Sequence, residues 1–182
     1  MNCFCFKLKE KYSKVQPTLY FDSYLPNSVV TQEIITSCKQ SWAEALKNIT
    51  LFYDEFYTYL FIHSPEIAKF FNSSNEEKKS NLNTIQVKAK SLIGMIQKVI
   101  NDVVPTNSPE SLLIKEKRIF QSIFKGHKMK EIQKHFYIPY TNAVFYALKK
   151  TLGNEIFTME VSNCWSILYS HVFDLMFIEK GN

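Results

Sequence analysis

From residue 28 onward, apolar side chains recur every three or four residues, and no other feature of the sequence constrains the fold as strongly. The first such stripe consists of Ile34, Ile35, Cys38, Trp42 and Leu46. This spacing places apolar side chains on one face of an α-helix, where they can pack against other helices. The chain has four Gly and six Pro in 182 residues, too few for a turn-rich all-β fold. The sequence therefore predicts an all-α fold of six to eight helices without strands.

Local signals set the ends of several predicted helices. Thr31 is the predicted N-cap of the first helix, and Ser64-Pro65 ends the second one. A long helix is predicted from Ile85 to Val103. Gly153 is the predicted C-terminal cap of the next-to-last helix, because glycine readily adopts the left-handed conformation found there. Thr158 is the predicted N-cap of the last helix.

The first 27 residues differ from the rest of the chain, because they show no sustained helical period. They contain four lysines between residues 7 and 14, and two prolines. We predict a flexible N-terminal extension over residues 1–27, followed by a single domain over residues 28–182. Cys3 and Cys5, next to these lysines, provide two sites for acylation and membrane association; the alternative is two unmodified thiols.

Charge and cysteine spacing exclude several classes of protein. The formal net charge of +5 is scattered, and no block of lysine and arginine alternates with aromatic residues, so we expect no nucleic-acid partner. None of the four cysteines forms a Cys-x-x-Cys pair, which argues against a structural zinc site. The sequence shows neither a signal peptide nor a run of 18 apolar residues. We therefore expect a cytoplasmic protein, membrane-associated at its N-terminus if Cys3 and Cys5 are acylated.

His127 is the first candidate for chemistry, because it lies at the end of a long apolar stretch. That stretch begins after Ser108-Pro109 and includes Phe120 and Phe124. A neutral imidazole nitrogen is one of the few protein groups that holds a haem iron axially. One histidine in this position is also compatible with a purely structural role. The residues around it must therefore distinguish an iron ligand from a structural histidine.

Five landmarks around His127 follow one another in the order found in globins. They are Lys39–Trp42, Phe61–Pro65, Gly126–Lys128, Leu152–Thr158, and Trp165 with Tyr169. Together the segments from about residue 32 to 178 resemble the globin family, in particular neuroglobins and the single-domain part of flavohaemoglobins. The resemblance implies a globin fold around a haem, the iron-containing protoporphyrin IX.

The resemblance also implies roles for individual residues. His127 corresponds to the proximal iron ligand, and Tyr137 to a tyrosine close to it. Phe71 corresponds to the phenylalanine that stacks on the haem, and Tyr57 to a distal tyrosine that hydrogen-bonds bound dioxygen.

The distal helix of the family corresponds to the segment around Leu92, which lies over the haem. The usual distal histidine or glutamine then falls on Lys88, a departure from the family; a shift in helical register would offer Gln86 instead. A lysine here can extend toward the haem propionates.

Three functions follow from these expectations. The first is a haem protein that reversibly binds dioxygen or another diatomic gas (NO or CO) for sensing, storage or scavenging. The second is nitric oxide dioxygenation, which needs an external reductase because no reductase domain follows in this sequence. The third is a globin-fold interaction module without haem. Whether the protein is an enzyme stays open at this point.

Overall fold

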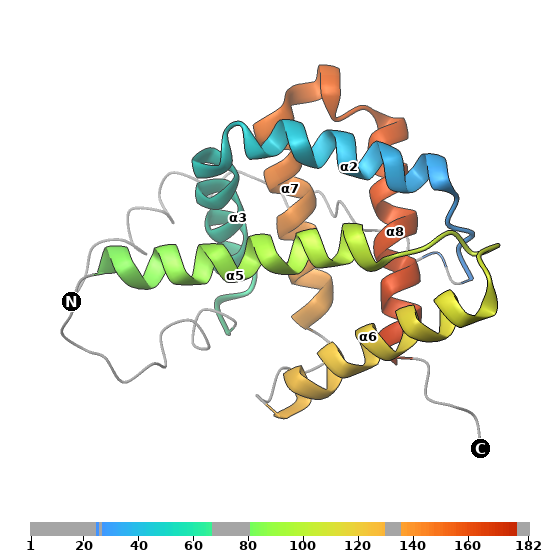
Figure 1. Ribbon diagram of the computed structural model, residues 1–182. Helices are drawn as coiled ribbons and strands as arrows, with labels where there is room; N and C mark the ends of the chain where they lie inside the picture. Colours follow the sequence, from blue (N-terminus) through green and yellow to red (C-terminus); the bar gives the residue numbers. More distant parts are fainter. Residues whose placement is uncertain (1–24, 26, 67–80, 130–135, 178–182) are drawn as a thin grey trace.

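Six α-helices make up most of the part of the chain that the structure describes (Figure 1). The computed structural model describes residues 25, 27–66, 81–129 and 136–177, without the side chains of residues 81–91 and 127–129. The helices are α2 (Gln32–Leu46), α3 (Ile49–His63), α5 (Asn81–Asp102), α6 (Glu110–Met129), α7 (Tyr137–Ile156) and α8 (Met159–Phe177). These residues contain no strand, which confirms the predicted all-α class.

The predicted helix caps are confirmed. The Thr31 hydroxyl accepts a hydrogen bond from the Ile34 N–H (3.4 Å), and the Thr158 hydroxyl accepts one from the Val161 N–H (3.4 Å). Each bond satisfies an N–H group that has no partner within the helix. Gly153 interrupts α7 with a φ of 70°, a conformation that glycine adopts at little cost, and a short stretch continues to Ile156.

Helix α7 forms the centre of the core. Its eight consecutive residues from Thr141 to Leu148 are all buried, so this helix is covered on every side. Helix α3 makes the most extensive contact with it, which includes the buried rings of Phe56 and Tyr59. The other helices of the core therefore pack around α7.

Helices α2 and α8 pack against each other through a buried tryptophan. The indole N–H of Trp165 donates a hydrogen bond to the Ser41 hydroxyl (2.9 Å), and the Trp165 side chain is fully buried. Trp42, one residue further along α2, is also buried and stands edge-on to Phe52 of α3 (5.2 Å between ring centroids). Both tryptophans thus anchor the core.

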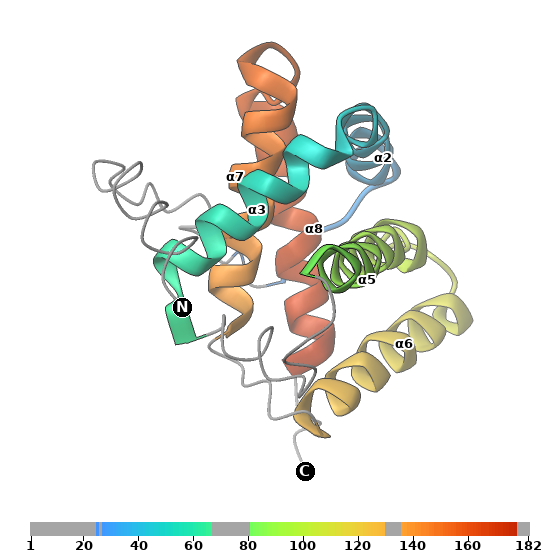
Figure 2. The same ribbon diagram turned by 90° about the vertical axis from the view of Figure 1, so that its left-hand side faces the viewer.

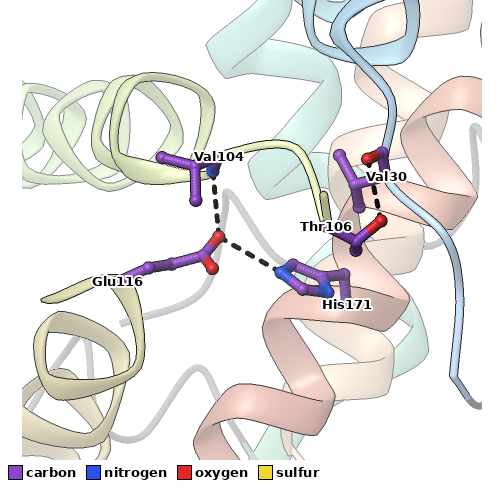
Figure 3. A network of polar contacts seen from close by, with 5 residues as sticks. All are labelled: Val30, Val104, Thr106, Glu116 and His171. Atoms are coloured by element: carbon purple, nitrogen blue, oxygen red, sulfur yellow. Dashed lines mark hydrogen bonds and ion pairs between the residues drawn. The ribbon is translucent and has the colours of Figure 1, made fainter. Parts of the chain in front are cut away.

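Helices α5 and α6 meet at the loop 103–109 and diverge from it, as Figures 1 and 2 both show. A buried carboxylate holds this corner together (Figure 3). Glu116 Oε1 accepts a hydrogen bond from the Val104 N–H (3.0 Å). The same oxygen lies 3.1 Å from His171 Nε2 on α8. Glu116 has only 2% of its surface exposed. Its position on α6 therefore connects that helix both to the end of α5 and to α8.

The described residues ahead of α2, residues 25 and 27–31, form a short strap against the C-terminal helix. The Leu25 N–H donates to the Ser170 hydroxyl (3.1 Å) and the Asn27 N–H donates to Asp174 Oδ2 (3.1 Å). The Val30 carbonyl accepts from the Thr106 N–H (2.9 Å) in the α5–α6 loop, a residue drawn in Figure 3. The strap thus includes residues upstream of position 28, where we placed the domain boundary.

Two sequence predictions lie outside the described residues. Cys3 and Cys5 precede the strap, and Phe71 falls between α3 and α5. None of the helices in the described ranges has the length and hydropathy needed to cross a membrane.

We predict that Glu116→Ala lowers the free energy of unfolding by about 3 kcal/mol, because it leaves the partly buried Val104 N–H and His171 imidazole without their acceptor. Glu116→Gln keeps an acceptor oxygen and is expected to cost about 1 kcal/mol. Urea denaturation measures both values. Glu44→Ala, which removes an exposed partner of Lys47, serves as the control, with an expected change below about 1 kcal/mol. Equal losses for Glu116→Ala and Glu44→Ala would contradict this account.

Candidate functional site

Four aromatic rings converge near the C-terminal end of α6, and we call them the α6 aromatic cluster. They are Phe124 of α6, Tyr137 of α7, and Phe173 and Phe177 of α8. Phe177 stands edge-on to both Phe124 (4.8 Å) and Tyr137 (5.0 Å). Such edge-to-face pairs are favourable beyond the area that they bury. The cluster fixes the end of α6 against the start of α7 and the end of α8.

His127 lies on α6, one turn beyond Phe124. Position 127 follows the buried Phe120 by seven residues, or two helical turns, so both positions share the face of α6 that carries Glu116. This face points toward the rest of the protein. Position 127 therefore lies one turn beyond Phe124, whose ring contacts Phe177, and Phe177 also contacts Tyr137, the predicted neighbour of His127.

Helix α5 supplies the next predicted residues. Leu92 is buried in the core, with 6% of its surface exposed. Position 88 precedes Leu92 by one turn and shares its face of the helix, whereas position 86 lies on a different face. Both positions belong to the half of α5 that lies away from the α5–α6 loop, where the two helices have diverged (Figure 1).

Tyr57 comes from α3 and lies at the edge of the core. Its ring stands edge-on to Phe56 (5.1 Å) and packs against Phe61 (5.6 Å). Burial raises the pKa of the Tyr57 phenol, and the nearby Tyr53 raises it further. The phenol therefore stays protonated well above neutral pH and is able to donate a hydrogen bond. Tyr137 is also kept protonated, because burial raises the pKa of its phenol.

Two further tyrosines belong to the same region, and the sequence alone assigned neither of them a role in the site. The ring of Tyr140, on α7, stands edge-on to Phe56 (5.5 Å), the same ring that Tyr57 contacts. The ring of Tyr169, on α8, packs near Trp165 (6.0 Å). The hydroxyls of Tyr140 and Tyr169 are both buried and have no hydrogen-bond partner among the described residues. Tyr140 lies one turn after Tyr137, and that spacing was the available signal.

Burial and mutual proximity change the acidity of this group of tyrosines. The pKa of the Tyr140 phenol is raised by burial and by the nearby Tyr57. The pKa of the Tyr169 phenol is raised by burial, by Tyr140 and by the Cys38 thiol. The ionisation of Tyr57 thus affects the pKa of Tyr140, and the ionisation of Tyr140 affects the pKa of Tyr169.

The remaining candidate features lie elsewhere. A surface groove of about 400 Å³ separates α5 from α6, but no predicted site residue lines it; its lining is Lys98, Ser111, Ile114, Lys115, Arg118, Ile119, Ser122 and Ile123. Within the described ranges, no three His, Cys, Asp or Glu side chains gather as a multidentate metal site. The structure leaves the predicted role of Phe71 untested, since that residue lies outside the described part, and the same holds for the side chains of Lys88 and His127.

Comparison with known families identifies the class of protein. The family model described as Globin matches residues 54–176, more than half of the chain. The chain therefore belongs to the globin family. The match extends from α3 to α8 and includes the predicted positions Tyr57, Leu92, His127 and Tyr137. A comparison with individually curated proteins gives no match.

The raised phenol pKa values predict a loss of stability at alkaline pH. The folded protein holds the Tyr140 and Tyr169 protons above pH 10, the ordinary pKa, where the unfolded chain releases them. Both states hold these protons below about pH 10, so the free energy of unfolding keeps its full value there. Above about pH 10 the unfolded chain loses the protons first, and the free energy of unfolding falls.

Urea denaturation between about pH 9 and about pH 11, with tyrosinate absorbance recorded in parallel, measures this decline. The double variant Tyr140→Phe/Tyr169→Phe should show a shallower decline than the wild type. An identical slope in the two proteins would show that these phenols ionise equally in both states.

Proposed function

We propose that this globin binds a haem and uses it to bind a diatomic gas reversibly. The observation that supports the proposal is the α6 aromatic cluster, which includes Tyr137 and begins one helical turn before position 127, in a chain whose family match covers these elements. When bound, a haem supplies an iron with a coordination position for the gas. The residues of the chain hold this group and control what reaches it.

The described residues fit a flat, apolar group with one axial donor. The cluster rings and Leu92 provide apolar surface, and position 127 lies on the inward face of α6. In this proposal the neutral imidazole of His127 would hold the iron, and Phe71 would pack against the haem. Tyr137, fixed by Phe173 and Phe177, helps to orient the end of the helix that carries His127.

On the opposite side, Tyr57 donates a hydrogen bond to the gas and Leu92 excludes water. Because position 88 shares a helix face with Leu92 and position 86 does not, the helical geometry favours Lys88 over Gln86 as the polar residue of α5. A lysine stem covers apolar surface while its ammonium group reaches solvent, where the haem propionates would lie.

We predict that the purified protein, supplied with haem, shows a Soret absorption band that His127→Ala abolishes or strongly shifts. Removing the imidazole leaves the iron without its protein ligand. Spectra of the ferric, ferrous and CO-bound forms measure the effect, and they also report the number of axial ligands.

His63→Gln is the matched control, because His63 packs against Tyr59 of α3 (4.2 Å between ring centroids) and its spectrum should equal that of the wild type. A folded His127→Ala protein with an unchanged spectrum would contradict the assignment of the ligand. A wild-type protein that takes up no haem would contradict the proposed function and favour the interaction module instead.

A further inference from the structure

The outward side of α6 carries basic side chains and no acidic one. We call it the basic face of α6, and its exposed residues recur at helical spacing: Ser111, Ile114, Lys115, Arg118, Ser122 and Lys125. Between residues 111 and 126 the sole acidic residue is Glu116. Glu116 is buried and lies on the opposite side of the helix, so it does not offset the positive charge of this face.

The groove between α5 and α6 extends this basic face toward α5. Lys98 of α5 lines the groove together with Lys115 and Arg118, and the half-buried Ile119 and Ile123 add aliphatic surface to it. Lys98 is paired with a neighbour on its own helix, whereas the described residues provide no ion-pair partner for Lys115 or Arg118. The surface thus combines available cations with accessible isoleucine side chains.

This combination is complementary to the surface of a membrane with anionic phospholipids. Their phosphate groups are acceptors for lysine and for the forked guanidinium of Arg118. Ile114, with 44% of its surface exposed, supplies an apolar side chain beside these cations, as helices that lie in the membrane interface do. A nucleic acid fits less well, because the groove lining contains no aromatic ring on which a base could stack.

We propose that the basic face of α6 docks on the surface of a membrane that contains anionic phospholipids. In the docked state the axis of α6 lies along the membrane surface, with Lys115 and Arg118 at the phosphates and Ile114 between the headgroups. Helix α6 lies at the periphery of the molecule in both views, which leaves its outward side free for such a contact (Figures 1 and 2). The contact requires neither a bound haem nor acylation of Cys3 and Cys5.

The test measures binding of the full-length protein to vesicles made of equal parts phosphatidylcholine and phosphatidylserine. Each basic residue close to an anionic membrane strengthens binding about fivefold, so we expect Lys115→Glu/Arg118→Glu to weaken it at least about thirtyfold. Vesicle co-sedimentation measures binding, and circular dichroism checks that the variant keeps its helices. Wild-type protein that binds these vesicles no better than vesicles of phosphatidylcholine alone would overturn the proposal.

Lys39→Glu/Lys47→Glu is the matched control, because it changes the net charge by the same amount on α2 and its C-cap. Helix α2 lies on the other side of the molecule from α6 (Figure 1). Charges at that distance are screened at about 0.15 M salt, so the control should weaken binding less than about threefold. The lysines of the N-terminal extension are the same in both variants. Equal losses in the two variants would show that net charge, and not the basic face of α6, determines binding, and would overturn the proposal.

A second variant distinguishes a membrane from other anionic partners. Ile114→Ser should weaken vesicle binding about fivefold, because it removes an apolar side chain that the membrane interface covers. Ile156→Ser, at an isoleucine of α7 with a similar exposure of 42%, should leave vesicle binding unchanged. If Ile114→Ser binds vesicles as the wild type does, while Lys115→Glu/Arg118→Glu loses binding both to vesicles and to a DNA duplex, the face recognises polyanions in general and the membrane proposal is wrong.

Discussion

The placement of α6 depends on one buried carboxylate. Glu116 accepts from the end of α5 and contacts His171 of α8, so a single side chain sets the register of the helix that carries His127. Burying a carboxylate is costly, and here Oε1 has two polar neighbours while Oε2 has none among the described residues. Such a group tolerates little displacement, because any shift of α6 would leave the charge without its partners. The α6 aromatic cluster then fixes the other end of the same helix.

Two different kinds of contact therefore surround the candidate site. On the side of α6 the contacts are the edge-to-face ring pairs of the α6 aromatic cluster and the polar contacts of Glu116. Together they hold the helix that carries His127, the expected iron ligand. On the side of α3 and α7 the rings of Phe56, Tyr57 and Tyr140 interlock, and the phenols remain neutral because they are buried. The first arrangement fixes the end of α6, and the second joins α3 to α7.

Much of the fold could be predicted from local signals. The helical period, the caps at Thr31 and Thr158 and the break at Gly153 all depend on residues within a few positions of one another. The Glu116–His171 contact could not be predicted, because it joins residues 55 positions apart and neither has a local pattern that indicates a partner. The surroundings of Tyr140 could not be predicted for a related reason: its ring contacts Phe56 on another helix, a neighbour that is present only after α3 has packed on α7.

The strap ahead of α2 has a consequence for the order in which the protein forms. Its bonds from Leu25 to Ser170 and from Asn27 to Asp174 span 145 and 147 residues of sequence. Contacts of such separation close long loops and form slowly, whereas the helix caps form from neighbours. During synthesis the strap has no place to bind until α8 has left the ribosome. The first described residues of the chain are therefore among the last to reach their final position.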